Sequence, residues 1–172
     1  MAAFALSSLL AGCGKMENSG RNGVYVNGRM ESELKSGFTG VLLDSNLHTI
    51  CLYANEYDRS PIPFSGNATV SVYGELIVKI KDEEILITKD CITSINVTIP
   101  SAELSIPMNH GVYEGTVDGI ASVEVADYSI GNVLNEQQMS KNVNSIDINI
   151  IFTDNRRIHI TYKGVMPFNG YY

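Results

Sequence analysis

The sequence predicts an all-β protein, and an antiparallel β-sandwich is the architecture that it favours. Apolar and polar residues alternate over most of the chain after residue 37, as they do in half-buried strands. Predicted strands recur at a spacing of roughly 8–12 residues, and turn residues lie between them. β-branched residues are also frequent, as is typical of strands. A small β-barrel is the alternative, because it shares this pattern. Alternation argues against a parallel α/β sheet, whose buried strands are continuously apolar.

The first strongly alternating segments lie in the middle of the chain. Val70 and Val72 share one face of a predicted strand whose other face is polar or aromatic. Residues 76–87 are expected to form a hairpin with an acidic tip at residues 82–84. A further strand is expected to turn three alternate residues inward, namely Ile95, Val97 and Ile99.

The clearest hairpin lies near the C-terminus. Its turn is placed at Thr153–Arg156, since the Asp and Asn there tolerate left-handed conformations. Helical signal is scarce: residues 132–142 fit one short helix or a structured loop, so at most one short helix is expected. The alternate apolar residues of the hairpin are Ile146, Ile148, Ile150 and Phe152 on its first strand, and Ile158, Ile160 and Tyr162 on its second.

The chain is acidic, and its charge excludes one class of function. Its 172 residues carry a net charge of −7, and 16 of the 19 acidic residues lie from Gly37 onward. Such a surface repels phosphate backbones, and no basic stretch interleaved with aromatic residues is present. We therefore expect no nucleic-acid binding.

An apolar run near the N-terminus stops at a cysteine. The run Ala2–Gly12 is too short to span a bilayer, which takes about 20 residues, but it has the length of a signal-peptide core. Leu10-Ala11-Gly12-Cys13 resembles the lipobox of bacterial lipoproteins. In that family the signal is cut just before the cysteine, which is then acylated. The alternative interpretation is a buried N-terminal strand or helix that holds a cysteine.

The resemblance implies a domain organisation and a location. Residues 1–12 are expected to be a signal peptide, and residues 13–36 a lipidated Cys13 with a flexible tether rich in Gly, Ser and Asn. Pairing of Val24–Val26 as an edge strand is the alternative for that part of the tether. Residues 37–172 are expected to form a single β domain. No Lys or Arg precedes the apolar run, so we expect the true start to lie upstream of Met1. By the same resemblance Gly14, which stands where many inner-membrane lipoproteins have Asp, favours the outer membrane, with the protein facing the periplasm.

The two remaining cysteines are candidates for a disulfide. With Cys13 committed to lipid, Cys51 and Cys91 form an even pair, and an oxidising periplasm permits a bridge between them. Both lie next to apolar segments, so two separately buried thiols are the alternative.

No motif in the sequence indicates catalysis, a cofactor or a metal. The three histidines, His48, His110 and His159, have no metal-ligand spacing, and His159 is expected to face solvent on the last strand. Nucleotide-binding and hydrolase motifs are absent. We therefore expect no catalytic residues, no cofactor and no metal ligands.

These observations favour a lipid-anchored, non-enzymatic interaction module of the bacterial envelope, whose protein or cell-wall partner and binding residues are unknown. One alternative is an inhibitor of a cationic cell-wall-degrading enzyme of the lysozyme type, which an acidic domain would attract. A second is a β-barrel that carries an apolar ligand.

Overall fold

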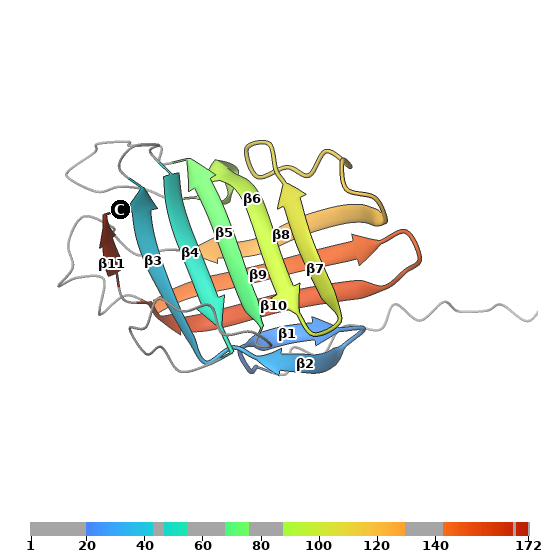
Figure 1. Cartoon of the computed structure of the whole chain (residues 1–172), viewed down its shortest axis with the longest axis horizontal. Coiled ribbons are helices and arrows are strands. Elements are labelled where there is room, and N and C mark those ends of the chain that lie inside the picture. Colours follow the sequence, from blue (N-terminus) through green and yellow to red (C-terminus); the bar gives the residue numbers. More distant parts are fainter. Residues whose placement is uncertain are drawn as a thin grey trace, which may run out of the picture.

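Two β-sheets packed face to face account for most of the chain that the structure describes (Figure 1). The structure is a computed structural model and describes residues 20–42, 47–54, 68–75, 88–129, 143–166 and 168–171. Within these ranges, sheet A has five strands and sheet B has six. No helix in the same ranges is long and apolar enough to cross a membrane.

Sheet A has the strand order β2-β1-β10-β9-β8. All its neighbouring strands are antiparallel. The bounds of its strands are β1 Gly23–Val26, β2 Arg29–Glu33, β8 Ile120–Ser129, β9 Val143–Phe152 and β10 Arg157–Val165.

Sheet B has the strand order β11-β3-β4-β5-β6-β7. Its strands are antiparallel except for β11, which runs parallel to β3. A short 3₁₀ turn, η1 (Lys89–Cys91), leads into β6. The bounds of the strands are β3 Ser36–Leu42, β4 Leu47–Tyr53, β5 Thr69–Glu75, β6 Ile92–Ile99, β7 Ala102–Pro107 and β11 Phe168–Tyr171.

The sheets form an open sandwich. Strands β3–β7 cross over β8–β10 in Figure 1, and each sheet keeps its own edge strands, β2 and β8 in sheet A and β11 and β7 in sheet B. The predicted β-sandwich is therefore confirmed. The barrel alternative is wrong, because the described strands are divided between two sheets, and with it the ligand-carrying barrel loses its structural basis.

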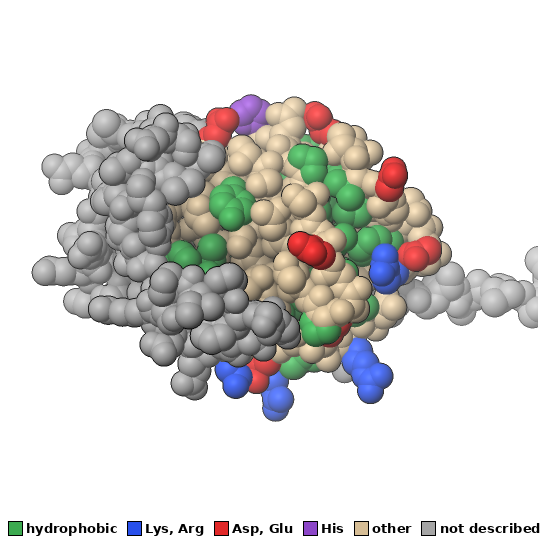
Figure 2. Space-filling model, viewed as in Figure 1, with side chains coloured by type: hydrophobic (Ala, Val, Ile, Leu, Met, Phe, Trp, Pro, Cys, Tyr) green, Lys and Arg blue, Asp and Glu red, His purple; other side chains and the backbone are tan. Residues whose placement is uncertain are grey.

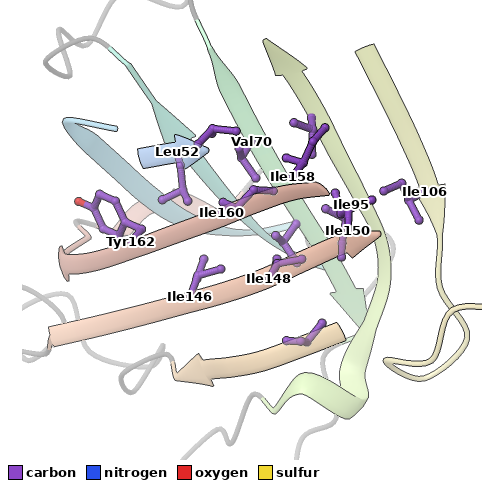
Figure 3. Close-up of a cluster of buried hydrophobic side chains, with 14 of the residues drawn as sticks. Leu52, Val70, Ile95, Ile106, Ile146, Ile148, Ile150, Ile158, Ile160 and Tyr162 are labelled. Carbon is purple, nitrogen blue, oxygen red and sulfur yellow. The ribbon is translucent and has the colours of Figure 1, made fainter. Parts of the chain in front are cut away.

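The core lies between the inner faces of the two sheets (Figure 3). The alternate residues predicted on β9 and β10 all point into it and are at most 4% exposed. Val70, Val72 and the three predicted inward residues of β6 meet them from sheet B. Burying one such side chain fully stabilises the fold by roughly 1.5–3 kcal/mol. The inward faces predicted from the alternation are therefore confirmed.

The turn between β9 and β10 forms where the sequence places it. Asn155 has a φ of 68°, in the left-handed region that Asn tolerates better than most residues. The Phe152 N–H donates to the Arg156 carbonyl oxygen at 2.9 Å, and the Arg156 guanidinium lies 4.1 Å from the centre of the Phe152 ring. The hairpin is thus closed by a backbone bond and a cation–π contact.

The β domain begins earlier in the chain than the predicted boundary at residue 37. Residues 13–36 were expected to be a flexible tether, but β1 and β2 lie within them and belong to sheet A. Asn27 and Gly28, with φ values of 50° and 79°, make the two-residue turn that suits a tight hairpin. Val24 and Leu34 are buried in the core, and β1 pairs along β10. This burial and pairing hold a segment whose composition alone indicates flexibility.

Two predicted elements, the possible helix at residues 132–142 and the hairpin at residues 76–87, lie outside the described residues.

The predicted disulfide between Cys51 and Cys91 is wrong, since both thiols are free and buried. Ile50 and Leu52 point into the core, so the alternation of β4 turns Cys51 to the outer face of sheet B. There its Sγ lies 3.5 Å from Ser71 Oγ, and burial raises the pKa of the thiol. Cys91 lies in η1, with its Sγ 3.7 Å from Thr88 Oγ1. The alternative prediction, that Cys51 and Cys91 are two separately buried thiols, is therefore confirmed.

A thiol count tests this correction. In the Cys13→Ser variant, denaturation without reductant should expose two reactive thiols per chain, those of Cys51 and Cys91. The urea midpoint should be the same with and without a reductant, because no bridge constrains the unfolded chain. The matched control, Cys13→Ser with Cys51→Ser, should expose one thiol. Thiols that appear only after reduction would contradict the structure.

Candidate functional site

The residues singled out from the sequence do not meet at one place. Cys13 lies outside the described residues, and Cys51 and Cys91 are not bonded. His110 is exposed in the connection between β7 and β8. Among the described residues, no group of three or more His, Cys, Asp or Glu side chains is arranged to hold a metal ion.

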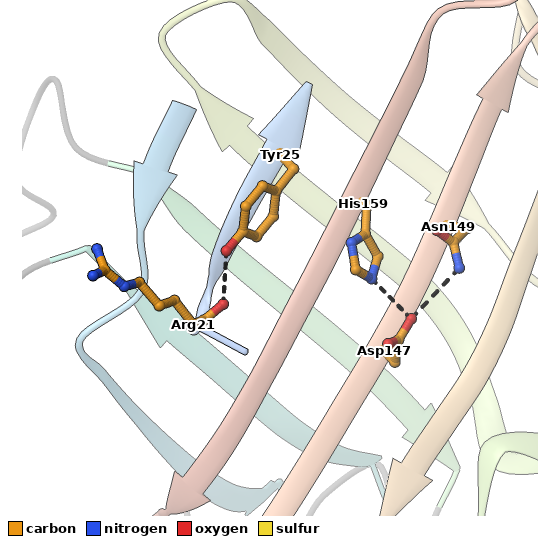
Figure 4. Close-up of polar contacts among 5 residues, drawn as sticks. All are labelled: Arg21, Tyr25, Asp147, Asn149 and His159. Carbon is orange, nitrogen blue, oxygen red and sulfur yellow. Dashed lines mark hydrogen bonds and ion pairs between the residues drawn. The ribbon is translucent and has the colours of Figure 1, made fainter. Parts of the chain in front are cut away.

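His159 lies in a polar cluster on the outer face of sheet A, the face turned away from sheet B (Figure 4). Its Nε2 donates to Asp147 Oδ1 at 3.0 Å, and Asn149 Nδ2 is 3.5 Å from the same oxygen. The Tyr25 ring lies 5.8 Å from the imidazole ring, centre to centre, and the Tyr25 hydroxyl donates to the Arg21 carbonyl oxygen. His159 was expected to face solvent. It does lie on the outer face, but its neighbours leave it only 7% exposed.

Three carboxylates continue this outer face toward its edge. We call Glu124 and Asp127 of β8, with Asp147 of β9, the acidic face. Asp127 and Asp147 are direct register partners, and like charges at such positions destabilise a strand pair. Ser145 Oγ donates to Asp127 Oδ2 at 2.5 Å, and His159 donates to Asp147, so each carboxylate accepts a side-chain hydrogen bond. The repulsion between the two facing carboxylates favours a cationic group beside the acidic face.

The outer face of sheet B has a different chemistry (Figure 2). Small neutral side chains form its central row across β5, β6 and β7, at Ser71, Asn96 and Ser105. Ser105 Oγ donates to Asn96 Oδ1 at 2.9 Å. Figure 2 shows that uncharged side chains dominate the described part of this face. The two outer faces thus differ in how their charges are arranged: sheet A has its carboxylates near β8 and the basic Arg157 and Lys163 on β10, whereas sheet B has the isolated carboxylates Glu75 and Glu103.

The edge strands are poorly suited to adding a strand from a partner. The β8–β9 register shifts twice, near Ile120 and near Val125, and such irregularities disturb an edge. Strand β7 ends at Pro107, which has no N–H to donate. The β2 residue Glu31 uses both carboxylate oxygens to accept bonds from Ser101, in the turn between β6 and β7. The faces of the sheets are therefore better candidates for recognition than their edges.

A second polar group lies inside the sandwich. His48 of β4 and Tyr128 of β8 face each other across the two sheets, with 2.6 Å between His48 Nε2 and Tyr128 Oη. They are 1% and 7% exposed. Burial lowers the pKa of His48 to about 4, against a smaller opposing effect of the Gly74 backbone. Burial also raises the pKa of Tyr128 well above its usual value, and nearby Cys91 raises it further. Both groups are therefore neutral at pH 7.

Sequence reasoning missed this pair, although one signal for it was available. His48 has the same alternation phase as Ile50 and Leu52, which places its ring on the inner face of β4. Tyr128 gave no such signal, because the register shift after Val125 breaks the alternation of β8.

No protein-family model matches the chain, and neither a curated protein nor a solved structure matches it. The fold and the polar groups therefore define its class by themselves. The chain is an all-β sandwich with three carboxylates clustered on the outer face of sheet A near β8 and a buried His–Tyr contact between its sheets.

The buried hydroxyl of Thr39 allows a test of the packing on the inner face of sheet B. Thr39 is 3% exposed on β3, and its Oγ1 has no hydrogen-bond partner. Thr39→Val keeps the shape and removes the unsatisfied group, so the free energy of unfolding should rise by about 1 kcal/mol in urea titrations. Thr98→Val, on the exposed side of β6, is the control and should change it by no more than about 0.5 kcal/mol. A clear loss of stability in Thr39→Val would show that the hydroxyl is satisfied.

Proposed function

We propose that the chain is a lipid-anchored protein of the bacterial cell envelope that acts as a non-enzymatic interaction module. The observation that carries the proposal is the sequence Leu10-Ala11-Gly12-Cys13 at the end of an apolar run. A β-sandwich follows within about ten residues, since β1 begins at Gly23. Cys13 is then the first residue of the mature protein, and Gly14 favours the outer membrane.

The anchor is strong because lipid attachment is additive. Each buried methylene contributes about 0.8 kcal/mol, so one acyl chain binds reversibly and two or more hold a protein firmly at the membrane. A lipoprotein cysteine carries several chains. The sandwich is thereby kept at the membrane surface on the periplasmic side, where it meets envelope proteins and the cell wall.

The polar groups of the sandwich support a binding role over a catalytic one. The ring of His48 is enclosed in the core, and His159 is enclosed by Tyr25 and bonded to Asp147. A general base needs to reach a substrate proton within hydrogen-bond distance. The broad surfaces that the described residues expose are the two outer faces, and flat faces of this kind suit macromolecular partners.

Membrane fractionation tests the anchor. Expressed from its natural gene, the wild-type protein should sediment with membranes, and Cys13→Ser should be released into the soluble fraction. Cys51→Ser is the control and should stay in the membrane fraction, because Cys51 is buried on β4. Recovery of both wild type and Cys13→Ser in the cytoplasmic fraction would overturn the proposal.

A second candidate function is inhibition of a cationic cell-wall-degrading enzyme. The acidic face favours it, because Asp127 and Asp147 repel each other in register and a cationic partner would relieve this repulsion. Oppositely charged surfaces also speed association and set its orientation.

A binding assay separates this candidate from the first. Basic lysozyme should bind the full chain at low salt, and binding should weaken steeply as salt screens the charges. Glu124→Gln with Asp127→Asn should weaken binding by about tenfold or more. The matched control, Glu75→Gln with Glu103→Gln, removes two carboxylates from sheet B and should have a small effect. No binding, or equal losses in both variants, would remove the candidate.

A further inference from the structure

The buried contact between His48 and Tyr128 joins the two sheets at the edge strand β8. His48 belongs to β4 of sheet B and Tyr128 to β8 of sheet A, and their 2.6 Å contact crosses the core. The ring centres lie 6.1 Å apart. Most other residues that face each other across the core are apolar. This contact therefore joins the two sheets through an imidazole that can gain a proton when the pH falls.

The absence of a side chain at Gly74 leaves room for the imidazole ring of His48. A Cβ added to Gly74 on β5 would lie 2.2 Å from His48 Cε1 and 2.7 Å from the Cys91 carbonyl oxygen. Any side chain at position 74 would therefore collide with the ring. Glycine is unfavourable inside a strand, so its position here is explained by the space that the buried ring needs.

Among the residues that the structure describes, no charged side chain contributes to the pKa of His48 or balances a protonated ring. Tyr128 faces it from β8, Cys91 lies nearby in η1, and β5 contributes Gly74. Its register partner on β3 is Val41. None of these described neighbours is a carboxylate, and burial keeps Tyr128 in its neutral form.

Protonation would therefore make the closed arrangement unfavourable. The protonated ring has two N–H donors, and one of them, Nε2–H, can donate to Tyr128 Oη. The other, Nδ1–H, has no hydrogen-bond partner in the closed structure, and the Gly74 backbone offsets only a small part of the cost of burying the charge. A buried charge without a partner and a buried donor without an acceptor both cost free energy. The ring reaches water only if the two sheets separate around it.

Strand β8 is the element that can move to allow this. It is an edge strand of sheet A, held on one side by β9 through a register that shifts twice. Strand β4, by contrast, lies between β3 and β5 in sheet B. Separation of the two sheets around His48 and Tyr128 therefore displaces β8 before it disturbs the strands of sheet B.

We propose that the His48–Tyr128 contact is a pH-sensitive latch, in which protonation of His48 releases β8 from β4 and opens this edge of the sandwich. The latch is independent of the lipid anchor and of the proposed partners. It gives an envelope protein a conformational response to acidification.

The sign of the pH dependence follows from the lowered pKa of His48. The ring titrates near 6.5 when exposed and at about 4 in the closed sandwich, so the open form binds more protons between these values. Above pH 6.5 the free-energy advantage of the closed form over the open form is at its full value, and it decreases as the pH falls toward 4. From pH 7.5 to pH 4.5, opening should increase by about 50- to 100-fold.

Hydrogen exchange measures the opening strand by strand. The full chain carrying Cys13→Ser is compared at pH 7.5 and 4.5, with exchange rates corrected for the intrinsic effect of pH. Protection of the β8 amides, and of the β9 amides that donate to β8, should fall by about 50- to 100-fold, while β10 and the strands of sheet B keep theirs. Unchanged protection of β8, or an equal loss in all strands, would overturn the latch.

Two variants assign the effect to the buried ring. His48→Gln cannot be protonated and should abolish the pH step in β8, whereas His159→Gln on the outer face should leave it intact. A pH step that persists in His48→Gln would contradict the proposal. Should His48→Gln not fold, the wild-type His48 ring is titrated by NMR instead. A pKa well below 6.5 supports the latch, and one at or above 6.5 overturns it.

Discussion

The fold depends on one constraint, the strict alternation of large apolar residues along the hairpin β9–β10. One face of this hairpin is covered entirely by buried side chains such as Ile148 and Ile160. These residues must be covered by a second layer, and sheet B supplies it. The other strands of sheet A are added outward from the hairpin, β1 and β2 beside β10 and β8 beside β9. The sandwich is thus organised around a hairpin that forms locally.

The sequence allowed prediction of the elements whose burial pattern is regular, and failed where a neighbour supplies the stability. Strand β6 was predicted correctly, because each of its inward residues is apolar. Strands β1 and β2 have only four and five residues, and their composition suggests flexibility. What holds them is pairing with β10 and burial of Leu34, which local patterns do not reveal. The local signals were the short apolar segment Val24–Val26 and the Asn27-Gly28 turn.

The candidate site was less predictable than the fold, because residue type and count do not say where a side chain points. The count of cysteines suggested a bridge, but the phase of Ile50 and Leu52 turns Cys51 outward. The acidic face depends on the register between β8 and β9, which brings Asp127 opposite Asp147. That register includes two shifts, and no sequence pattern marks them. Sites formed by strand pairing are therefore the part of this protein that needed the structure.

The buried His–Tyr contact is best explained as a device for specificity. An apolar residue in place of His48 would fill the core without a desolvated nitrogen, and a larger residue in place of Gly74 would strengthen β5. Two unfavourable choices therefore coincide at one contact. A slip of β4 by one residue would move His48 outward and Thr49 inward, and Tyr128 would lose its partner. The contact thus penalises the wrong register, and the same desolvation makes it sensitive to a proton.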